Sequence, residues 1–190
     1  MNDIAHDILE RAANGDMAAF EQIYKAASSF VYNVALRITC NSADAEEVAQ
    51  DVFMRIYHHL KDFQFSSTFK TWIYRITVNA AINHYRKHIK ERRARVNNEH
   101  VLDLIPANLS TDEKALQGDY QTQLDQLLKA LNPEHRACLV LREIEGLNYQ
   151  EMATVLRIPV NTVRSRLKRA RQSLLDQARK ETQNDVPRNM

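Results

Sequence analysis

Glycine scarcity is the feature of this sequence that most restricts its fold. Only three of the 190 residues are glycine, Gly15, Gly118 and Gly146, whereas average proteins contain roughly 7%. The dinucleotide motif GxGxxG and the P-loop motif GxxxxGK(S/T) cannot be built from these positions. The sequence also has few glycines for the positive φ angles that tight β-hairpins need. The sequence therefore predicts an all-α protein without a glycine loop for phosphate.

The overall composition is that of a globular chain in water. Hydrophobic residues make up 44% and charged residues 26%, and no apolar run approaches the roughly 20 residues of a membrane span. The N-terminal region is acidic and lacks the basic start and apolar run of a secretory signal. Cys40 and Cys138 are far apart and lack zinc-site spacing, so both are expected to stay reduced. We expect a cytosolic protein without a metal or cofactor.

Charge is distributed in four alternating blocks. Residues 1–63 carry a net charge of −5, residues 64–95 carry +7, residues 96–133 carry −4 and residues 134–190 carry +4. Such blocks indicate two surfaces for polyanions, separated by acidic segments that could meet a protein partner. Solvated helix faces are the simpler alternative.

Hydrophobic periodicity predicts helices in the first half of the chain. A turn at 14–16 precedes apolar residues at helical spacing from Phe20 to Ile38. Ser42 is expected to cap a second helix that runs to about Lys61. Its polar side is expected to face solvent or a partner with Gln50, Asp51, Met54 and His58.

A third helix is predicted from Thr68 to about Arg95, after a break at 63–67. Five polar residues follow one another along one side of it: Arg75, Asn79, Asn83, Arg86 and Lys90. Amide and guanidinium groups bind base edges and phosphates. Because Glu91 is the only acidic residue in 64–95, this polar stripe predicts nucleic-acid contact. Trp72 lies on the apolar side, where core packing and base stacking are both open.

A second helical domain is predicted after an irregular segment. Residues 96–110 lose helical periodicity and are expected to form a linker. Ser110 and Glu113 have the spacing of a capping box, which predicts the start of the second domain. Asn132 and the proline that follows it predict another helix start, and Gly146 predicts its end.

The C-terminal region predicts a helix-turn-helix. A short helix from Asn148, a turn at 157–159 and a second helix from Val160 suit a motif whose second helix enters the DNA major groove. No acidic residue occurs from Arg157 to Arg171, where six of fifteen residues are basic. A packed helical hairpin with a basic face is the alternative.

No constellation of residues predicts catalysis. His84 and His88 are four apart and could share a metal, but no carboxylate or third ligand lies near them in sequence. Surface histidines are therefore expected. The acidic residues at 44–47 are explained by a helix N-terminus, which favours negative charge. A metal enzyme built on the two histidines is the weakest of the alternatives.

Five segments together resemble the extracytoplasmic-function (ECF) sigma factors of bacterial RNA polymerase, in the sigma-E-like branch of the sigma-70 superfamily. They are GDMAAF at 15–20, DAEEVAQDVF at 44–53, FKTWIYRITVNA at 69–80, YQEMA at 149–153 and PVNTVRSRL at 159–167. Their order and spacing match the family over nearly the whole chain. The resemblance implies a sigma-2 domain at 1–95, a flexible acidic linker at 96–110, a sigma-4 domain at 111–180 and a disordered tail at 181–190.

The resemblance assigns two DNA-binding surfaces. The promoter-melting loop and the next helix would hold the unpaired minus-ten strand through Phe63, Phe65, Phe69, Lys70, Trp72, Arg75, Asn79, Asn83 and Arg86. The helix-turn-helix would read the minus-thirty-five duplex in the major groove through Arg164, Ser165, Lys168 and Arg169. Its phosphate contacts would come from Tyr149, Arg166 and Arg171.

The resemblance also implies protein partners. Gln50, Asp51 and Met54 would dock on the clamp helices of the largest polymerase subunit, and the flap of the second-largest subunit would be a further contact. An anti-sigma factor, often membrane-anchored in this family, would clamp between the two domains. The chain would be a cytoplasmic specificity subunit for a stress or envelope response and not an enzyme, since catalysis belongs to the polymerase.

Two positions depart from the family pattern. Phe65 stands where glycine is frequent, in a loop that lacks the family's acidic residue, and Asn161 also replaces a frequent glycine. These departures leave the identity of the captured base open. The main alternative is a helix-turn-helix regulator that binds duplex DNA without replacing sigma. That alternative would not explain the polar stripe from Arg75 to Lys90.

Overall fold

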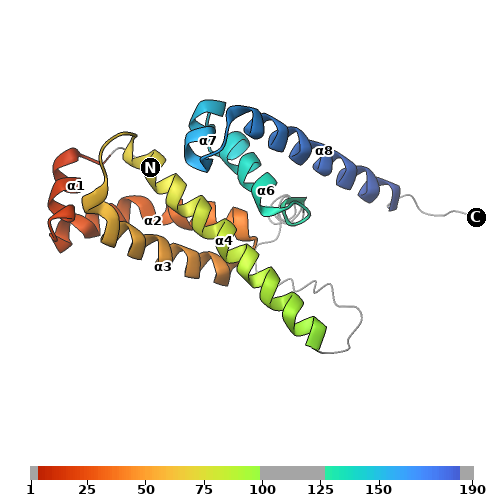
Figure 1. Cartoon of the computed structure of the whole chain (residues 1–190), viewed down its shortest axis with the longest axis horizontal. Coiled ribbons are helices and arrows are strands. Elements are labelled where there is room, and N and C mark those ends of the chain that lie inside the picture. The colour runs from red at the N-terminus through yellow and green to blue at the C-terminus, as the bar shows by residue number, and fades with distance from the viewer. Residues whose placement is uncertain (1–3, 99–126, 185–190) are drawn as a thin grey trace, which may run out of the picture.

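All regular elements in the described part of the chain are helices. The computed structural model describes residues 4–98 and 127–184 (Figure 1). The first half contains α1 (His6–Ala13), α2 (Met17–Thr39), α3 (Ser42–His59), the 3₁₀ helix η1 (Leu60–Asp62) and α4 (Phe69–Asn98). The second half contains α6 (Pro133–Leu139), the π-helix η2 (Val140–Ile144), α7 (Tyr149–Leu156) and α8 (Val160–Asn184). The all-α prediction is confirmed.

Polar caps set where several of these helices begin. Asn132 and Asn148 cap α6 and α7, as the sequence predicts. At α3 the cap is Asn41 and not the predicted Ser42, because Oδ1 of Asn41 accepts a hydrogen bond from the amide of Asp44 at 2.9 Å. Asn41 keeps an extended backbone, as a capping residue does, whereas Ser42 is already the first helical residue.

One helix and the ends of two others differ from what the sequence leads us to expect. Periodicity does not predict α1, which has only eight residues. Helix α4 continues to Asn98, past the predicted end near residue 95. Helix α8 continues to Asn184, into the segment 181–190 that is expected to be a disordered tail. Neither extension contains glycine or proline, so no residue interrupts the hydrogen-bond ladder. The predicted capping box at 110–113 lies outside the described residues.

The core of the first half lies between α2, α3 and α4. Ile23 and Val34 of α2, Val52 and Ile56 of α3, and Ile73 of α4 are fully buried. Burying one such side chain stabilises the fold by roughly 1.5 to 3 kcal/mol. This packing leaves the opposite sides of α3 and α4 to carry the predicted docking residues and the polar stripe.

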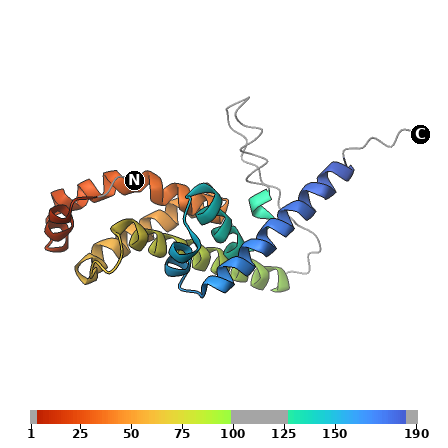
Figure 2. The same ribbon diagram turned by 90° about the horizontal axis from the view of Figure 1, so that it is seen from above.

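The second half of the chain packs against α2 and α4 (Figures 1 and 2). The Arg136 side chain is fully buried at this contact. It donates hydrogen bonds to the main-chain carbonyls of Leu128 at 2.7 Å and Leu131 at 2.9 Å, and to the carbonyl of Ile38 at the end of α2. Its guanidinium carbon lies 4.9 Å from the ring centroid of Tyr85. Main-chain carbonyls from both halves therefore compensate this buried charge.

Replacing Arg136 by alanine should lower the free energy of unfolding by about 3 kcal/mol, because buried carbonyls lose their donor. Urea denaturation followed by circular dichroism measures this change. Arg55→Ala is the control, since Arg55 is exposed and forms a surface ion pair with Asp51; it should change stability by less than about 1 kcal/mol. Equal losses in the two variants would contradict a structural role for the buried guanidinium.

Candidate nucleic-acid interface

Helices α7 and α8 form the predicted helix-turn-helix. Asn148 and Glu151 make a capping box at the start of α7, in which the Glu151 carboxylate accepts from the Asn148 amide at 2.7 Å. Arg157 ends α7 in the left-handed region, at a φ of 52°. Met152 of α7 and Val163 of α8 are fully buried. The caps and the apolar contact together fix the angle at which α8 leaves the turn.

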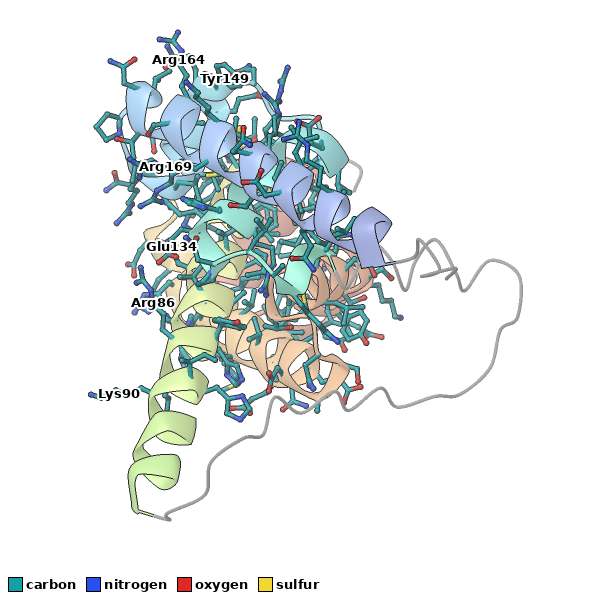
Figure 3. All side chains as sticks on the ribbon, turned by 90° about the vertical axis from the view of Figure 1, so that its right-hand side faces the viewer. Arg86, Lys90, Glu134, Tyr149, Arg164 and Arg169 are labelled. Atoms are coloured by element: carbon teal, nitrogen blue, oxygen red, sulfur yellow. The ribbon has the colours of Figure 1, made fainter. Side chains whose placement is uncertain are left out.

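The N-terminal half of α8 presents a basic face to solvent (Figure 3). Four of the residues predicted for the major groove are exposed there: Arg164, Ser165, Lys168 and Arg169. Arg166 is half-buried. Arg164 donates a hydrogen bond to Oδ1 of Asn161 at 3.0 Å, so the asparagine that departs from the family pattern orients the first arginine of this face.

Tyr149 and Arg171 contact other residues of the second half. Arg171 donates to the Glu143 carboxylate at 2.6 Å, and this bond raises the pKa of Arg171. The guanidinium carbon of Arg142 lies 5.3 Å from the ring centroid of Tyr149. A phosphate bound by Arg171 would therefore compete with Glu143 for the same donor.

The polar stripe lies along α4 as its spacing predicts. Asn79, Asn83, Arg86 and Lys90 are exposed, and Arg75 is half-buried. The side-chain amides of Asn79 and Asn83 present both hydrogen-bond donors and acceptors, and they lie between the positively charged side chains of the row. Such a row is suited to an unpaired strand, whose bases expose hydrogen-bonding edges and whose backbone carries regular negative charge.

The second half of the chain reaches both ends of this stripe. Arg86 pairs with Glu134 of α6, and Figure 3 shows the two side chains side by side. At the other end, burial lowers the pKa of Arg75 and the nearby positive charge of Arg157 lowers it further. Lys70, near the start of α4, is half-buried.

Most of the aromatic residues in the loop between η1 and α4 and in the first turn of α4 are buried. Phe63, Phe69 and Trp72 are 7% or 8% exposed, and their ring centroids lie 5.3 to 5.7 Å apart. Phe65 is 46% exposed, stacks on His6 at 4.2 Å and has a φ of 54°. This left-handed backbone suits glycine, the residue frequent at this position in the family. The three buried rings pack under the loop, and Phe65 is the one of the four with an exposed ring.

The predicted docking residues lie on the outer side of α3. Gln50 is exposed, Met54 is 57% exposed, and Asp51 accepts a hydrogen bond from Arg55 at 2.8 Å. Beside them, α2 and α3 border a groove of about 1030 Å³ that Gln50 and Met54 line together with aromatic residues such as Tyr24. An exposed apolar surface of this kind is typical of a protein-binding site.

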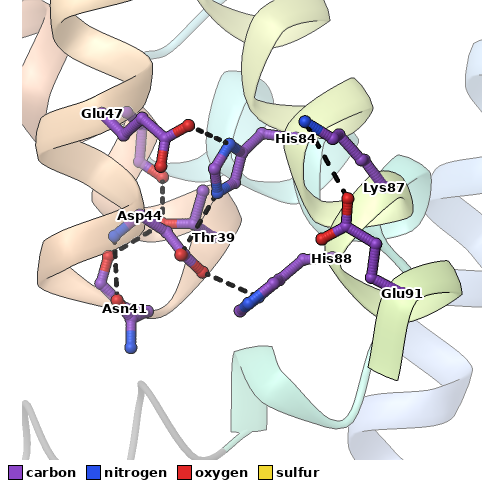
Figure 4. Close-up of polar contacts among 9 residues, drawn as sticks. Thr39, Asn41, Asp44, Glu47, His84, Lys87, His88 and Glu91 are labelled. Carbon is purple, nitrogen blue, oxygen red and sulfur yellow. Dashed lines mark hydrogen bonds and ion pairs between the residues drawn. The ribbon is translucent and has the colours of Figure 1, made fainter. Parts of the chain in front are cut away.

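His84 and His88 meet carboxylates that come from α3 (Figure 4). His84 Nε2 lies 3.2 Å from Asp44 Oδ1, and His84 Nδ1 lies 3.8 Å from Glu47 Oε1. His88 Nδ1 lies 3.6 Å from Asp44 Oδ2. Within the described residues, no group of three or more His, Cys, Asp or Glu side chains has the geometry of a metal site. We interpret this cluster as a polar contact between α3 and α4.

Cys40 and Cys138 form no disulfide with each other, and burial raises the pKa of the Cys138 thiol to about 11. The Cys138 thiol therefore stays protonated at neutral pH.

Within 4–98 and 127–184, no helix combines the length and the apolar character that crossing a membrane requires.

Comparison with known proteins identifies the family. Sigma-70 region 2 matches residues 23–91, and Sigma-70, region 4 matches residues 121–174. RNA polymerase sigma-H factor of Pseudomonas aeruginosa is 32% identical over 177 residues, which cover 88% of this chain and 90% of that protein. ECF RNA polymerase sigma-E factor of Escherichia coli K12 is 31% identical over 183 residues, with the same coverage. The chain belongs to the ECF sigma factors, which are transcription initiation factors.

Solved structures share the fold of this chain. CnrH in complex with the cytosolic domain of CnrY is similar with a TM-score of 0.63 and 26% identity, over 90% of this chain and 94% of that one. Sigma factor RpoE in complex with the anti-sigma factor NepR from Bartonella quintana has a TM-score of 0.59 and 21% identity, over 83% and 94%. The predicted organisation into sigma regions 2 and 4 is confirmed.

Sequence reasoning missed the residues that join the two halves. They are Tyr74, Glu134, Arg136 and Glu145. Of these four residues, only Arg136 has a local sequence signal for burial. It directly precedes the apolar residues Ala137, Cys138 and Leu139, and helical spacing places it near the buried side of that helix. The others look like ordinary polar positions, and their partners are distant in sequence.

His135 should make stability depend on pH. Burial, followed by the positive charges of Arg166 and Arg169, lowers the pKa of His135. The folded chain thus favours the neutral imidazole, whereas the unfolded chain binds a proton near pH 6.5. Stability should fall as the pH drops below about 6.5, and the loss should be complete below the folded pKa.

His135→Gln should therefore lose less unfolding free energy than the wild type between about pH 7 and pH 5. Urea denaturation at several pH values measures the difference. His58→Gln is the control, because it removes an exposed histidine of α3 and leaves His135 and its surroundings intact. A wild-type profile in His135→Gln would contradict the prediction.

Proposed function

We propose that this protein is an alternative sigma factor that binds RNA polymerase core and directs initiation at a particular set of promoters. The observation that carries the proposal is the presence, on one sigma-family chain, of two polar surfaces with different chemistry. Helix α4 has an amide-rich row suited to an unpaired strand, and α8 has an arginine-rich face suited to duplex DNA. The proposed domains are residues 1–95 and 111–180, joined by the acidic linker at 96–110.

The first domain would recognise and hold the opened minus-ten element. Asn79 and Asn83 are exposed on α4 and would bind base edges, while Arg75 and Arg86 would bind the strand's phosphates. The ring of Phe65, which is exposed in the loop before α4, would offer a stacking surface for an unpaired base. Phe63, Phe69 and Trp72 would act by fixing the loop, because their rings are buried.

The second domain would recognise the minus-thirty-five element as duplex. Arg164, Lys168 and Arg169 are exposed on the α8 face that a helix-turn-helix inserts into the major groove. A bidentate arginine contact to guanine contributes roughly 1 to 3 kcal/mol of discrimination. Arg166, Arg171 and Tyr149 would hold phosphates and set the register of the domain on DNA.

Protein partners would bind outside these DNA surfaces. The α3 side with Gln50, Asp51 and Met54 would dock on the clamp helices of the largest polymerase subunit, and the second domain would contact the flap of the second-largest. One solved structure described above contains CnrH bound to the cytosolic domain of CnrY, and the other contains sigma factor RpoE bound to the anti-sigma factor NepR. These complexes support control of this chain by an anti-sigma factor, membrane-anchored or soluble. The protein would work in the cytoplasm and would have no catalytic site of its own.

Asp51→Lys should abolish comigration of the purified chain with RNA polymerase core in gel filtration at moderate salt. The variant places a second positive charge beside Arg55 on the proposed docking side. Glu21→Lys is the matched control, since Glu21 belongs to an equivalent exposed ion pair with Lys25 on α2. If the wild type fails to comigrate yet binds duplex DNA, the protein is a helix-turn-helix regulator that acts without polymerase.

Mutations in the two proposed DNA surfaces should impair different steps, duplex binding for α8 and strand opening for α4. Arg164→Ala should weaken duplex binding to the upstream element by about 1 to 3 kcal/mol, measured by mobility shift with a promoter selected from a random library. Asn79→Ala should leave that binding intact and reduce strand opening, measured by permanganate reactivity of unpaired thymines.

Two controls accompany this pair of variants. Arg179→Ala lies on the same helix as Arg164 and is exposed beyond the proposed major-groove residues, and Asn33→Ala changes an exposed asparagine on α2. Both should behave as wild type. Equal losses in both assays for Arg164→Ala and Asn79→Ala would contradict the proposed division between α4 and α8.

A further inference from the structure

The first turn of α8 contains a hydrogen bond between two exposed side chains. Nη1 of Arg164 donates to Oδ1 of Asn161 at 3.0 Å. A guanidinium has only donors, so the atom of Asn161 that faces it is the amide oxygen. Residues three apart in a helix lie on the same face. The bond therefore holds the guanidinium of Arg164 in one place beside the start of α8.

This orientation of Arg164 depends on the residue at position 161. Ser165 provides a comparison, because its hydroxyl donates to the main-chain carbonyl of Thr162 at 2.9 Å. A serine on any helix can make such a bond, since a main-chain carbonyl is present at every position. The acceptor for Arg164 is a side chain instead. Replacing Asn161 by a residue without a side-chain oxygen therefore removes it.

The acceptor of Arg164 carries no charge. An amide oxygen orients the guanidinium without cancelling its positive charge, so the attraction to DNA phosphates is retained. Arg171 differs, because its partner is the carboxylate of Glu143 at 2.6 Å. DNA must compete with that carboxylate for Arg171. At Arg164 the guanidinium is oriented and its charge is still available to DNA.

The bond to Asn161 leaves Arg164 able to bind a base. A guanidinium has five N–H groups, and a bidentate contact with O6 and N7 of guanine uses two of them. Ordering a long exposed side chain when DNA binds lowers affinity by roughly two- to tenfold. Because the bond to Asn161 is present before DNA arrives, part of that ordering has already taken place in the free chain.

A role in starting the helix does not explain Asn161. The residue lies inside α8, which begins at Val160. The carbonyl of Pro159 accepts hydrogen bonds from the amides of Thr162 at 2.9 Å and Val163 at 3.1 Å. The side-chain oxygen of Asn161 faces a guanidinium and not a main-chain amide. Its geometry thus fits a role toward the neighbouring arginine.

We propose that Asn161 is a positioning residue for sequence recognition: it holds the Arg164 guanidinium ready for one base pair of the duplex and so sets how strongly the chain prefers guanine there. This inference rests on the proposed role of α8 in reading duplex DNA. Asn161 acts through Arg164 and does not itself contact the base. Its contribution therefore appears as base preference at a single pair and not as affinity for DNA in general.

The test uses the full-length chain and a library of duplexes with a randomised central segment. Sequencing of the bound fraction, followed by competition between duplexes that differ at one pair, measures the base preference at each pair. Arg164→Ala identifies the pair that Arg164 reads, because the guanine preference is lost there. At that pair, Asn161→Ala should lower the guanine preference about fivefold, because the guanidinium is no longer held. Preferences at the other pairs should remain those of the wild type.

Three further variants separate positioning from charge and direct contact. Gln172→Ala is the matched control, since it removes an exposed amide that donates to Asp176 farther along α8, and it should keep the wild-type preference. Asn161→Asp keeps an oxygen acceptor, so it should retain the guanine preference while its negative charge lowers affinity for all sequences. Arg164→Ala/Asn161→Ala should match Arg164→Ala. Alanine is a stronger helix former than asparagine, so these variants keep α8 folded.

The outcomes distinguish this inference from the proposed function. An unchanged guanine preference in Asn161→Ala, at the pair that Arg164→Ala identifies, would overturn the inference and leave the role of α8 intact. A further loss of preference in the double variant would show that Asn161 reads a base itself, which would also overturn it. If the wild type selects no sequence, or if Arg164→Ala keeps every preference, the reading of duplex DNA by α8 fails and the positioning by Asn161 fails with it.

Discussion

The arrangement of the two halves depends on how the protein buries the charge of Arg136. A buried guanidinium without compensation costs several kcal/mol, as an order of magnitude. Here the carbonyls of Leu128 and Leu131, just before α6, and the carbonyl of Ile38 at the end of α2 accept its hydrogen bonds. Because the last of these belongs to the other half, satisfying this one side chain places α6 against α2 and α4. The contacts of Glu134 and Glu145 with the first half follow from that placement.

Helix α4 connects the core to the proposed function. Its apolar side supplies Ile73 and Trp72 to the core, so the helix is held rigidly against α2 and α3. Its polar side presents Asn79 and Asn83 at fixed spacing, because residues three and four apart share a helix face. The same rigidity lets the second half cover part of that row. One element therefore provides the scaffold, the proposed strand-binding surface and the contact with the second domain.

Local patterns predicted most elements of the fold and most positions of the candidate surfaces. The caps at Asn132 and Asn148 and the exposed row on α4 follow from interactions within a few residues, which a sequence displays directly. The cap at Asn41 was missed because two adjacent residues have capping side chains and only backbone geometry separates them. The burial of Phe63 was missed because a loop pattern does not say whether a ring turns inward.

The sequence by itself determined the helical class, the positions of the two exposed polar surfaces on α4 and α8 and the resemblance to the sigma family, because all three depend on local spacing and on motifs. Only the tertiary structure decided which helices meet. Tyr74 and Glu145 are 71 residues apart, Arg86 and Glu134 are 48 apart, and His84 meets the carboxylate of Asp44 on a different helix. Helical periodicity says which face of a helix is polar and carries no information about the partner of that face. That partner is chosen by packing and by the need to satisfy buried polar groups such as the Arg136 guanidinium.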